Sequence, residues 1–131
     1  MLKIIHCSGK RKRAIARATL RPGKGRVVIN NKPVDIYASS FRVLRIKEPL
    51  LLAGDLARKV DISVKVNGGG INSQADAARL AIAKTLAQFS KPLEKVFLGY
   101  DRHLLVADVR RREAYKPNDS RARAARQKSY R

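Results

Sequence analysis

The chain has 131 residues, of which 30 are lysine or arginine and 10 are acidic, giving a formal charge of +20 at pH 7. This excess is far outside the range of ordinary soluble enzymes and indicates a polyanionic partner, for which nucleic acid is the usual candidate. No apolar run approaches the length of about 18 residues that a membrane span requires. The single cysteine excludes an intrachain disulfide, so we expect a reducing, cytoplasmic location.

The positive charge is concentrated at the two ends of the chain. Residues 1–26 hold nine lysines or arginines and no acid, residues 27–108 hold twelve basic and eight acidic residues, and residues 109–131 hold nine basic and two acidic residues. The middle therefore has the charge balance of an ordinary globular domain. We expect a folded, nucleic-acid-binding domain over residues 1–108 and an extended basic tail over residues 109–131. The tail has no apolar periodicity, so we expect it to be disordered until a polyanion holds it.

The N-terminal part predicts two strands. Residues 2–7 are apolar and β-prone, and a flexible Ser-Gly with four successive cations follows them. Residues 14–20 alternate between small or apolar and other side chains, which is typical of a half-buried strand. Arg17 and Arg21 fall on its outer face. Ordinary solvated faces carry charges of both signs, so a face with cations alone favours a polyanionic partner.

A turn with suitable chemistry follows, because Pro22 fixes φ and Gly23 and Gly25 tolerate positive φ. Residues 26–30 are expected to return as the partner strand of residues 14–20. This predicts a hairpin that carries cations around its tip.

The middle of the chain predicts core packing without chemistry. A turn at residues 30–33 precedes a helix over residues 41–47, with Ser39 or Ser40 as its cap. Pro49 should interrupt this helix. The short apolar run that follows should end at Gly54, which suits a left-handed C-terminal cap.

The clearest strand spans residues 61–67, and three glycines link it to the strongest helix signal, residues 75–89. Arg79 falls at the edge of the apolar face of that helix. The many alanines predict that the helix lies close to the sheet. One more short helix is expected from Pro92 to Gly99, with Ser90 as its cap.

The sequence argues against catalysis and against a bound metal or cofactor. The glycines lack the third glycine of a dinucleotide fingerprint and the Gly-Lys-Ser/Thr of a phosphate loop, so they are expected to allow positive φ and a close backbone approach. His6 and Cys7 should point to opposite faces of a strand, and Cys7 is expected in the core. His103 has no carboxylate or second histidine at ligand spacing, which excludes an arguable metal or acid–base site.

Four segments together resemble the universal small-subunit ribosomal protein nine family. They are Gly68-Gly69-Gly70-Ile71-Asn72-Ser73-Gln74-Ala75-Asp76-Ala77-Ala78-Arg79 with its continuation to Leu86, Ser8-Gly9-Lys10-Arg11-Lys12 with the strand after it, the Arg21-Pro22-Gly23 turn, and Gln127-Lys128-Ser129-Tyr130-Arg131. The resemblance covers almost the whole chain. The last four residues are similar to the archaeal and eukaryotic branch, and the short length favours an archaeon.

The resemblance implies a non-enzymatic component of the small-subunit head. It implies an α+β fold with a mixed sheet packed against helices and an unusual left-handed βαβ crossover, which general rules disfavour. The expected partners are ribosomal RNA and neighbouring head proteins, with no membrane and no small-molecule substrate. The family tail threads through rRNA, so that its last residues approach the anticodon stem-loop of the tRNA in the P site.

Carried onto this sequence, these roles fall on two sets of residues. The cations expected to bind rRNA are Lys10, Arg11, Lys12, Arg13, Arg17, Arg21, Lys24, Arg26, Arg79, Arg110, Arg111, Arg112, Lys116, Arg121, Arg123 and Arg126. The residues expected to contact tRNA are Lys128, Ser129, Tyr130 and Arg131.

Two alternatives from other classes are weighed against this hypothesis. A free, histone-like nucleic-acid-binding protein would share the charge but has no need for a singular terminal tetrapeptide. A small transferase or nuclease would need a catalytic constellation that the sequence lacks.

Overall fold

A mixed sheet of five strands forms one layer of the protein, in the order β1-β2-β5-β3-β4. This computed structural model describes residues 3–125. The strands are β1 (Ile5–Arg11), β2 (Ala14–Pro22), β3 (Val27–Ile29), β4 (Lys32–Pro33) and β5 (Val60–Asn67). The β1–β2, β2–β5 and β3–β4 pairs are antiparallel, and the β3–β5 pair is parallel. The α+β class with a mixed sheet is thus confirmed.

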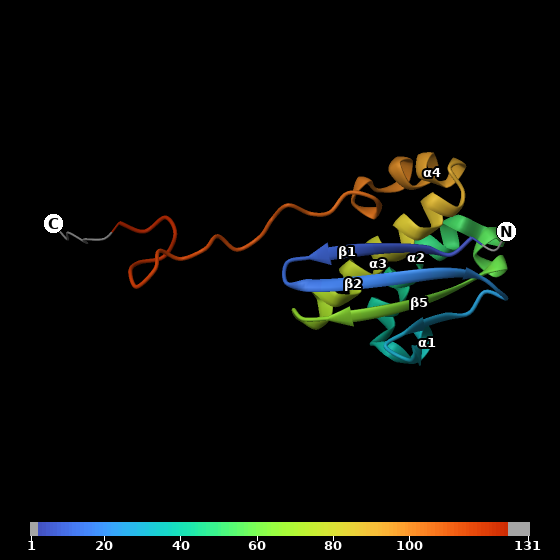
Figure 1. Cartoon of the computed structure of the whole chain (residues 1–131), viewed down its shortest axis with the longest axis horizontal. Coiled ribbons are helices and arrows are strands. Elements are labelled where there is room, and N and C mark those ends of the chain that lie inside the picture. Colours follow the sequence, from blue (N-terminus) through green and yellow to red (C-terminus); the bar gives the residue numbers. More distant parts are fainter. Residues whose placement is uncertain (1–2, 126–131) are drawn as a thin grey trace.

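The helices form a second layer on one face of the sheet. They are α1 (Val34–Tyr37), α2 (Ser40–Ala53), α3 (Ile71–Phe89) and α4 (Pro92–Tyr100), with the short 3₁₀ helices η1 (Gly54–Lys59) and η2 (Arg102–Leu104). In Figure 1, β1, β2 and β5 lie in front, and α2 and α3 lie behind them. The connection from β3 to its parallel neighbour β5 runs through α1, α2 and η1, which makes it the βαβ crossover of this fold. Its left-handed sense stays a prediction of the family resemblance.

The central strands match their sequence patterns. Ala14, Ala16, Ala18 and Leu20 are fully buried along β2, and the alternate residues of this strand are exposed or half-buried. The same alternation buries the apolar residues of β5. On β1, Cys7 is buried while its neighbour His6 is exposed, as predicted.

The expected hairpin across residues 22–25 is wrong, because β3 does not pair with β2. Strand β5 lies between them and takes its hydrogen bonds from both sides. The Gly23 N–H donates to the Lys59 carbonyl at 3.0 Å, and the Ile62 N–H donates to the Arg26 carbonyl at 2.8 Å. The turn therefore wraps around the start of β5. The predicted turn does form, and Gly25 has a φ of 90° in it. However, β5, the more apolar strand from later in the chain, takes the place next to β2.

The hairpin that does form joins β1 to β2. Strand β1 continues through Lys10 to Arg11, so the expected flexible segment after residue 7 is instead part of the strand. Lys12 adopts a φ of 53° in the two-residue connection. Four cations that the sequence placed in a loose cluster are thereby held on a strand end and a tight turn.

Two helix boundaries also differ from the predictions. Pro49 lies inside α2 and is buried, so it does not end the helix as expected. A proline here removes the hydrogen bond to the carbonyl four residues earlier, but burial of Ile46 and Ala53 on either side keeps both halves of the helix in the core, where α2 packs against α3. Gly54 ends α2 with a φ of 57°, as predicted. Helix α3 begins at Ile71, four residues before its expected start.

The alanines of α3 bring this helix very close to β1, as predicted. A side chain on Gly9 would lie 2.4 Å from the Ala77 carbonyl oxygen and 2.7 Å from the Ala81 nitrogen, so only glycine fits between strand and helix. The glycines before α3 serve the purpose that the sequence indicated. Gly69 has a φ of 65° and lies against the backbone of Ala14.

The last helical part closes the end of this layer. Leu93 and Phe97 of α4 are buried, and Lys91 rather than the expected Ser90 is the N-terminal cap of this helix. Leu104 of η2 is also fully buried. Residues 105–125 contain neither helix nor strand.

Candidate nucleic-acid interface

A cationic groove lies where the β1–β2 turn meets the start of the basic C-terminal segment. It has a volume of about 1010 Å³, and it is lined by the β1–β2 turn, the glycine junction before α3 and the first residues after the folded domain. The basic side chains among its lining residues are Lys12, Arg13, Arg110, Arg111 and Arg112. These two clusters are about 100 positions apart in the sequence, and the fold brings them to one surface.

The only acidic residue that lines this groove is Glu113, and its carboxylate is already occupied. The guanidinium of Arg123 donates to both Glu113 oxygens, at 3.0 Å and 3.1 Å through Nε. This interaction lowers the pKa of Glu113. Glu113 therefore does not neutralise Lys12, Arg13 or Arg111, which take part in none of the ion pairs within residues 3–125 and are suited to bind phosphate groups. The guanidinium of Arg110 differs, because it pairs with Asp108.

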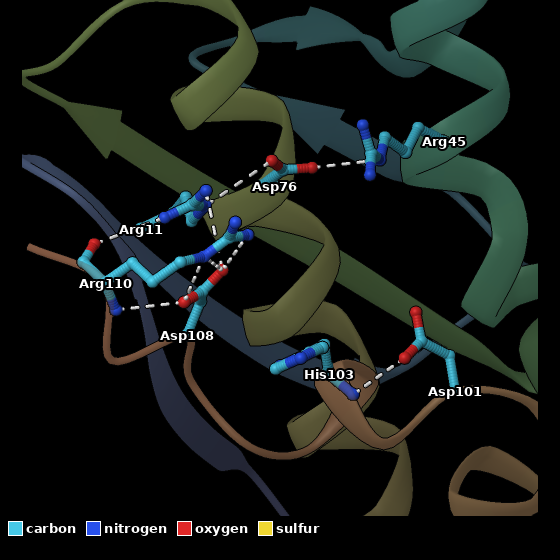
Figure 2. Close-up of polar contacts among 7 residues, drawn as sticks. All are labelled: Arg11, Arg45, Asp76, Asp101, His103, Asp108 and Arg110. Atoms are coloured by element: carbon cyan, nitrogen blue, oxygen red, sulfur yellow. Dashed lines mark hydrogen bonds and ion pairs between the residues drawn. The ribbon is translucent and has the colours of Figure 1, made fainter.

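An ionic network fixes the point at which the basic segment leaves the domain (Figure 2). The Arg11 guanidinium lies 3.5 Å from the Asp108 carboxylate and 3.9 Å from that of Asp76. Asp76 also pairs with Arg45 of α2 at 3.0 Å. This network thus links β1, α2, α3 and the segment before Arg110.

Arg110 folds back on this network. Its backbone N–H donates to Asp108 Oδ1 at 3.0 Å, and its guanidinium donates to both oxygens of the same carboxylate. The Arg110 carbonyl accepts from Arg11 Nη1 at 3.4 Å. These bonds from Arg110, together with the charge of Arg11, hold the pKa of Asp108 well below its usual range.

A second cationic region surrounds the turn that precedes β3. Asp61 Oδ1 accepts the backbone N–H groups of Lys24 and Arg26, both at 2.9 Å, which lowers the pKa of this carboxyl. The side chains of Arg21, Lys24 and Arg26 remain exposed around the turn. Asp61 therefore shapes the backbone of the turn, and the exposed side chains of the turn still present positive charge.

The sheet face opposite the helices is the third cationic surface. Within residues 3–125, no helix covers the outer face of β1, β2 and β5 (Figure 1). Lys10, Arg17 and Lys65 are exposed there. Lys65 was absent from the predicted set, and the only signal for it was its alternation with the apolar residues of β5.

Arg79 differs from the other predicted cations, because it is buried. Only 7% of this residue is exposed, and its Nη2 pairs with Glu48 and, at 3.1 Å, with Asp101. The guanidinium links α3 to α2 and to the start of η2. Its contact with RNA stays a prediction, and this geometry instead favours a role in joining helices.

The basic segment after the domain forms a local loop within residues 109–125. Besides the Glu113–Arg123 pair, the Lys116 ammonium donates to the Ala124 carbonyl at 2.7 Å. Arg112 lies over the ring of Tyr115, 4.6 Å from its centre. Arg121 and Arg123 are exposed. An extended path along phosphates stays a prediction, and it would require opening of the Glu113–Arg123 pair.

Several predicted residues lie outside the described part of the chain. They are Arg126, Lys128, Ser129, Tyr130 and Arg131. Within residues 3–125, no group of three His, Cys, Asp or Glu side chains is arranged to hold a metal ion. No helix in the same range is long and apolar enough to cross a membrane.

A mixed sheet with helices on one face, and cations gathered on the other face and at the chain ends, defines an α+β protein built to bind a polyanion. Comparison with known proteins makes the assignment specific. The family described as ribosomal protein S9/S16 matches residues 9–131, and the chain belongs to this family.

Archaeal proteins are among its curated relatives. The small ribosomal subunit protein uS9 of Methanococcus vannielii is 46% identical over 134 residues, covering 99% of this chain and all of the relative. The protein of the same name from Methanococcus maripaludis is 45% identical with the same coverage. The archaeal type expected from the sequence is thus confirmed. Membership of a family of ribosomal proteins also supports the assignment as a protein without enzymatic activity.

Proposed function

We propose that this protein is a structural component of the small ribosomal subunit, acting in the cytoplasm, that binds rRNA and reaches the P-site tRNA with its C-terminus. The observation that carries the proposal is the convergence of the two cationic ends on one groove. Lys12 and Arg13 meet Arg110, Arg111 and Arg112 there, and the one acid is occupied. A surface of this kind neutralises several phosphates at once, which is the main source of affinity for RNA.

The place where the basic segment leaves the domain supports the finer part of the proposal. The network around Asp108 fixes where the basic segment begins, beside the groove. Residues 109–131 can span at most about 75 Å when extended, which is enough to cross from a docked domain to a distant RNA. The tRNA contact itself rests on the family resemblance of Lys128, Ser129, Tyr130 and Arg131. Because contacts to phosphates carry no direct sequence information, the terminal contact should serve all tRNAs alike.

The decisive experiment removes residues 128–131 from the protein in an archaeal host or in a reconstituted subunit. Subunits should still assemble with the shortened protein, while retention of tRNA in the P site or the fidelity of initiation falls. A control variant with Lys91 and Lys95 changed to glutamine loses an equal number of positive charges, two, from exposed positions at the start of α4 and within it. Unchanged tRNA retention and fidelity in the shortened protein would rule out the tail function.

The same material tests the histone-like alternative. Gradient sedimentation at moderate salt should place the full-length protein with small subunits. A protein that sediments free of them would favour a general nucleic-acid-binding role instead.

A further inference from the structure

Two cations lie directly opposite each other on the uncovered face of the sheet. The register of the antiparallel β2–β5 pair places Arg17 against Lys65, and the β1–β2 pair places Ser8 on the other side of Arg17. Both cations are exposed. Like charges in directly opposite positions destabilise a sheet, so this pair works against the folded state unless something outside the sheet neutralises it.

No carboxylate offsets these two charges from within the described part of the chain. The ion pairs and hydrogen bonds of residues 3–125 include no partner for the Arg17 or Lys65 side chain. Asp61 lies further along β5, and its carboxylate accepts the N–H groups of Lys24 and Arg26. The positive charge of this face is therefore not balanced within the described domain, and it is complementary to the negative charge of a polyanion.

The neighbouring rows on this face carry mostly polar, hydrogen-bonding side chains. One row is His6, Thr19 and Ser63, and the row on the other side is Lys10, Ile15 and Asn67. The His6 ring is already hydrogen-bonded to the Thr19 hydroxyl at 2.9 Å. None of these residues is Phe, Tyr or Trp, and the one aromatic ring in the two rows, that of His6, is engaged with Thr19, so the rows hold no large aromatic platform for unpaired bases. Hydroxyl, amide and cationic groups instead match phosphate oxygens and ribose hydroxyls.

We propose that the open face of β1, β2 and β5 docks on the sugar-phosphate backbone of duplex RNA, with Arg17 and Lys65 as its central phosphate contacts. The proposal rests on the proposed function. It adds to that function the surface that binds, and it specifies that this surface binds duplex RNA. The cationic groove and the tail are separate contacts, because they lie at the β1–β2 turn and beyond residue 108. Their contacts with single-stranded RNA should not depend on the sheet face.

The test measures the affinity of the full chain for two RNAs of equal length, a blunt duplex and an unstructured single strand, over a range of salt concentrations. The double variant R17Q/K65Q should bind the duplex at least about tenfold more weakly at moderate salt, and its slope of log affinity against log salt should fall by about 2. Its affinity for the single strand should stay within about twofold of the wild type. The conservative variant R17K/K65R should keep duplex binding, because it keeps both charges.

The control pair K91Q/K95Q removes two exposed cations, one from the cap of α4 and one from the helix itself, away from this face. An equal loss of duplex affinity in the control, or an equal loss for both RNAs in R17Q/K65Q, would reduce the effect to overall charge and overturn the proposal. Unchanged duplex affinity in R17Q/K65Q would also overturn the proposal, and it would favour an acidic neighbouring protein as the partner of this face. A wild-type chain that binds neither RNA would instead contradict the proposed function. Misfolding is checked separately, since R17Q/K65Q removes a like-charge pair and should melt no lower than the wild type.

Discussion

The guanidinium of Arg11, at the end of β1, lies 3.5 Å from the carboxylate of Asp108, immediately before the basic segment. Both side chains are largely shielded, with 18% and 14% of their surface exposed. Arg11 was expected to bind rRNA, yet its contacts are with Asp76, Asp108 and the Arg110 carbonyl. These contacts favour a role for Arg11 in fixing where the basic segment begins, and its contact with rRNA stays a prediction.

Replacing Asp108 by asparagine should loosen the basic segment without unfolding the domain. The change keeps the shape of the side chain and removes the charge that holds Arg11 and Arg110. Ion pairs near the surface are weak, so we expect trypsin to cleave at residues 110–112 about two- to fivefold faster, with little change in melting temperature. Asp55, which pairs with Arg58 at 4.0 Å on the surface, provides the matched control. Equal cleavage rates for D108N and the wild type would contradict the anchoring role.

The same anchor should depend on pH only under acidic conditions. The pKa of Asp108 is held low in the folded protein, mainly by its bonds to Arg110, whereas a free aspartate titrates near about 3.9. A lowered pKa stabilises the folded form above the free value, and this contribution is lost as the pH falls below it. Protection of the Arg110 amide, whose N–H donates to Asp108, should therefore be constant from pH 8 to about pH 5, after correction for the intrinsic exchange rate, and decline below about pH 4. In D108N this decline should be absent, and a decline centred near neutral pH would point to another group.

Gly9 should be the least replaceable glycine of the domain. An alanine side chain there would meet the backbone of α3 at Ala77 and Ala81, and backbone cannot move aside as a side-chain end can. Overpacking of this kind costs about 2 to 3 kcal/mol. Chemical denaturation of G9A should show this loss of unfolding free energy. In G99A, where nothing lies within 4 Å of the new methyl group, stability should instead rise by about 0.5 kcal/mol.

The sequence predicted local features well and long-range pairing poorly. The alternation in residues 14–20 and 61–67, the helix through Ala78, Ile82 and Leu86, and the cap at Gly54 were all confirmed. These depend on neighbours within a few positions. The hairpin across residues 22–25 failed because strand order depends on β5, about 40 positions later in the chain, and no local pattern reports that competition.

The candidate site shows the same contrast between local features, which the sequence predicts, and long-range contacts, which it does not. Charge counting located the cationic ends, but it could not separate cations that face outward from those that hold the fold together. Arg11 and Arg79 look like RNA-binding residues in the sequence, and both are occupied by carboxylates from distant elements. Lys65 was overlooked because it sits in a segment of balanced charge, and only the register of β5 against β2 places it beside Arg17.

Arg79 tests most directly the distinction between cations that bind RNA and cations that hold the fold together. Replacing it by alanine leaves Glu48 and Asp101 without their partner between α2, α3 and η2, so the free energy of unfolding should fall by about 2 kcal/mol. The two carboxylates are partly exposed, which keeps this below the cost of breaking a fully buried pair. Affinity for duplex RNA, measured below the melting transition, should stay within about twofold of the wild type. R17A should behave in the opposite way, with unchanged stability and weaker RNA binding. A loss of RNA affinity in folded R79A would restore Arg79 as an RNA contact.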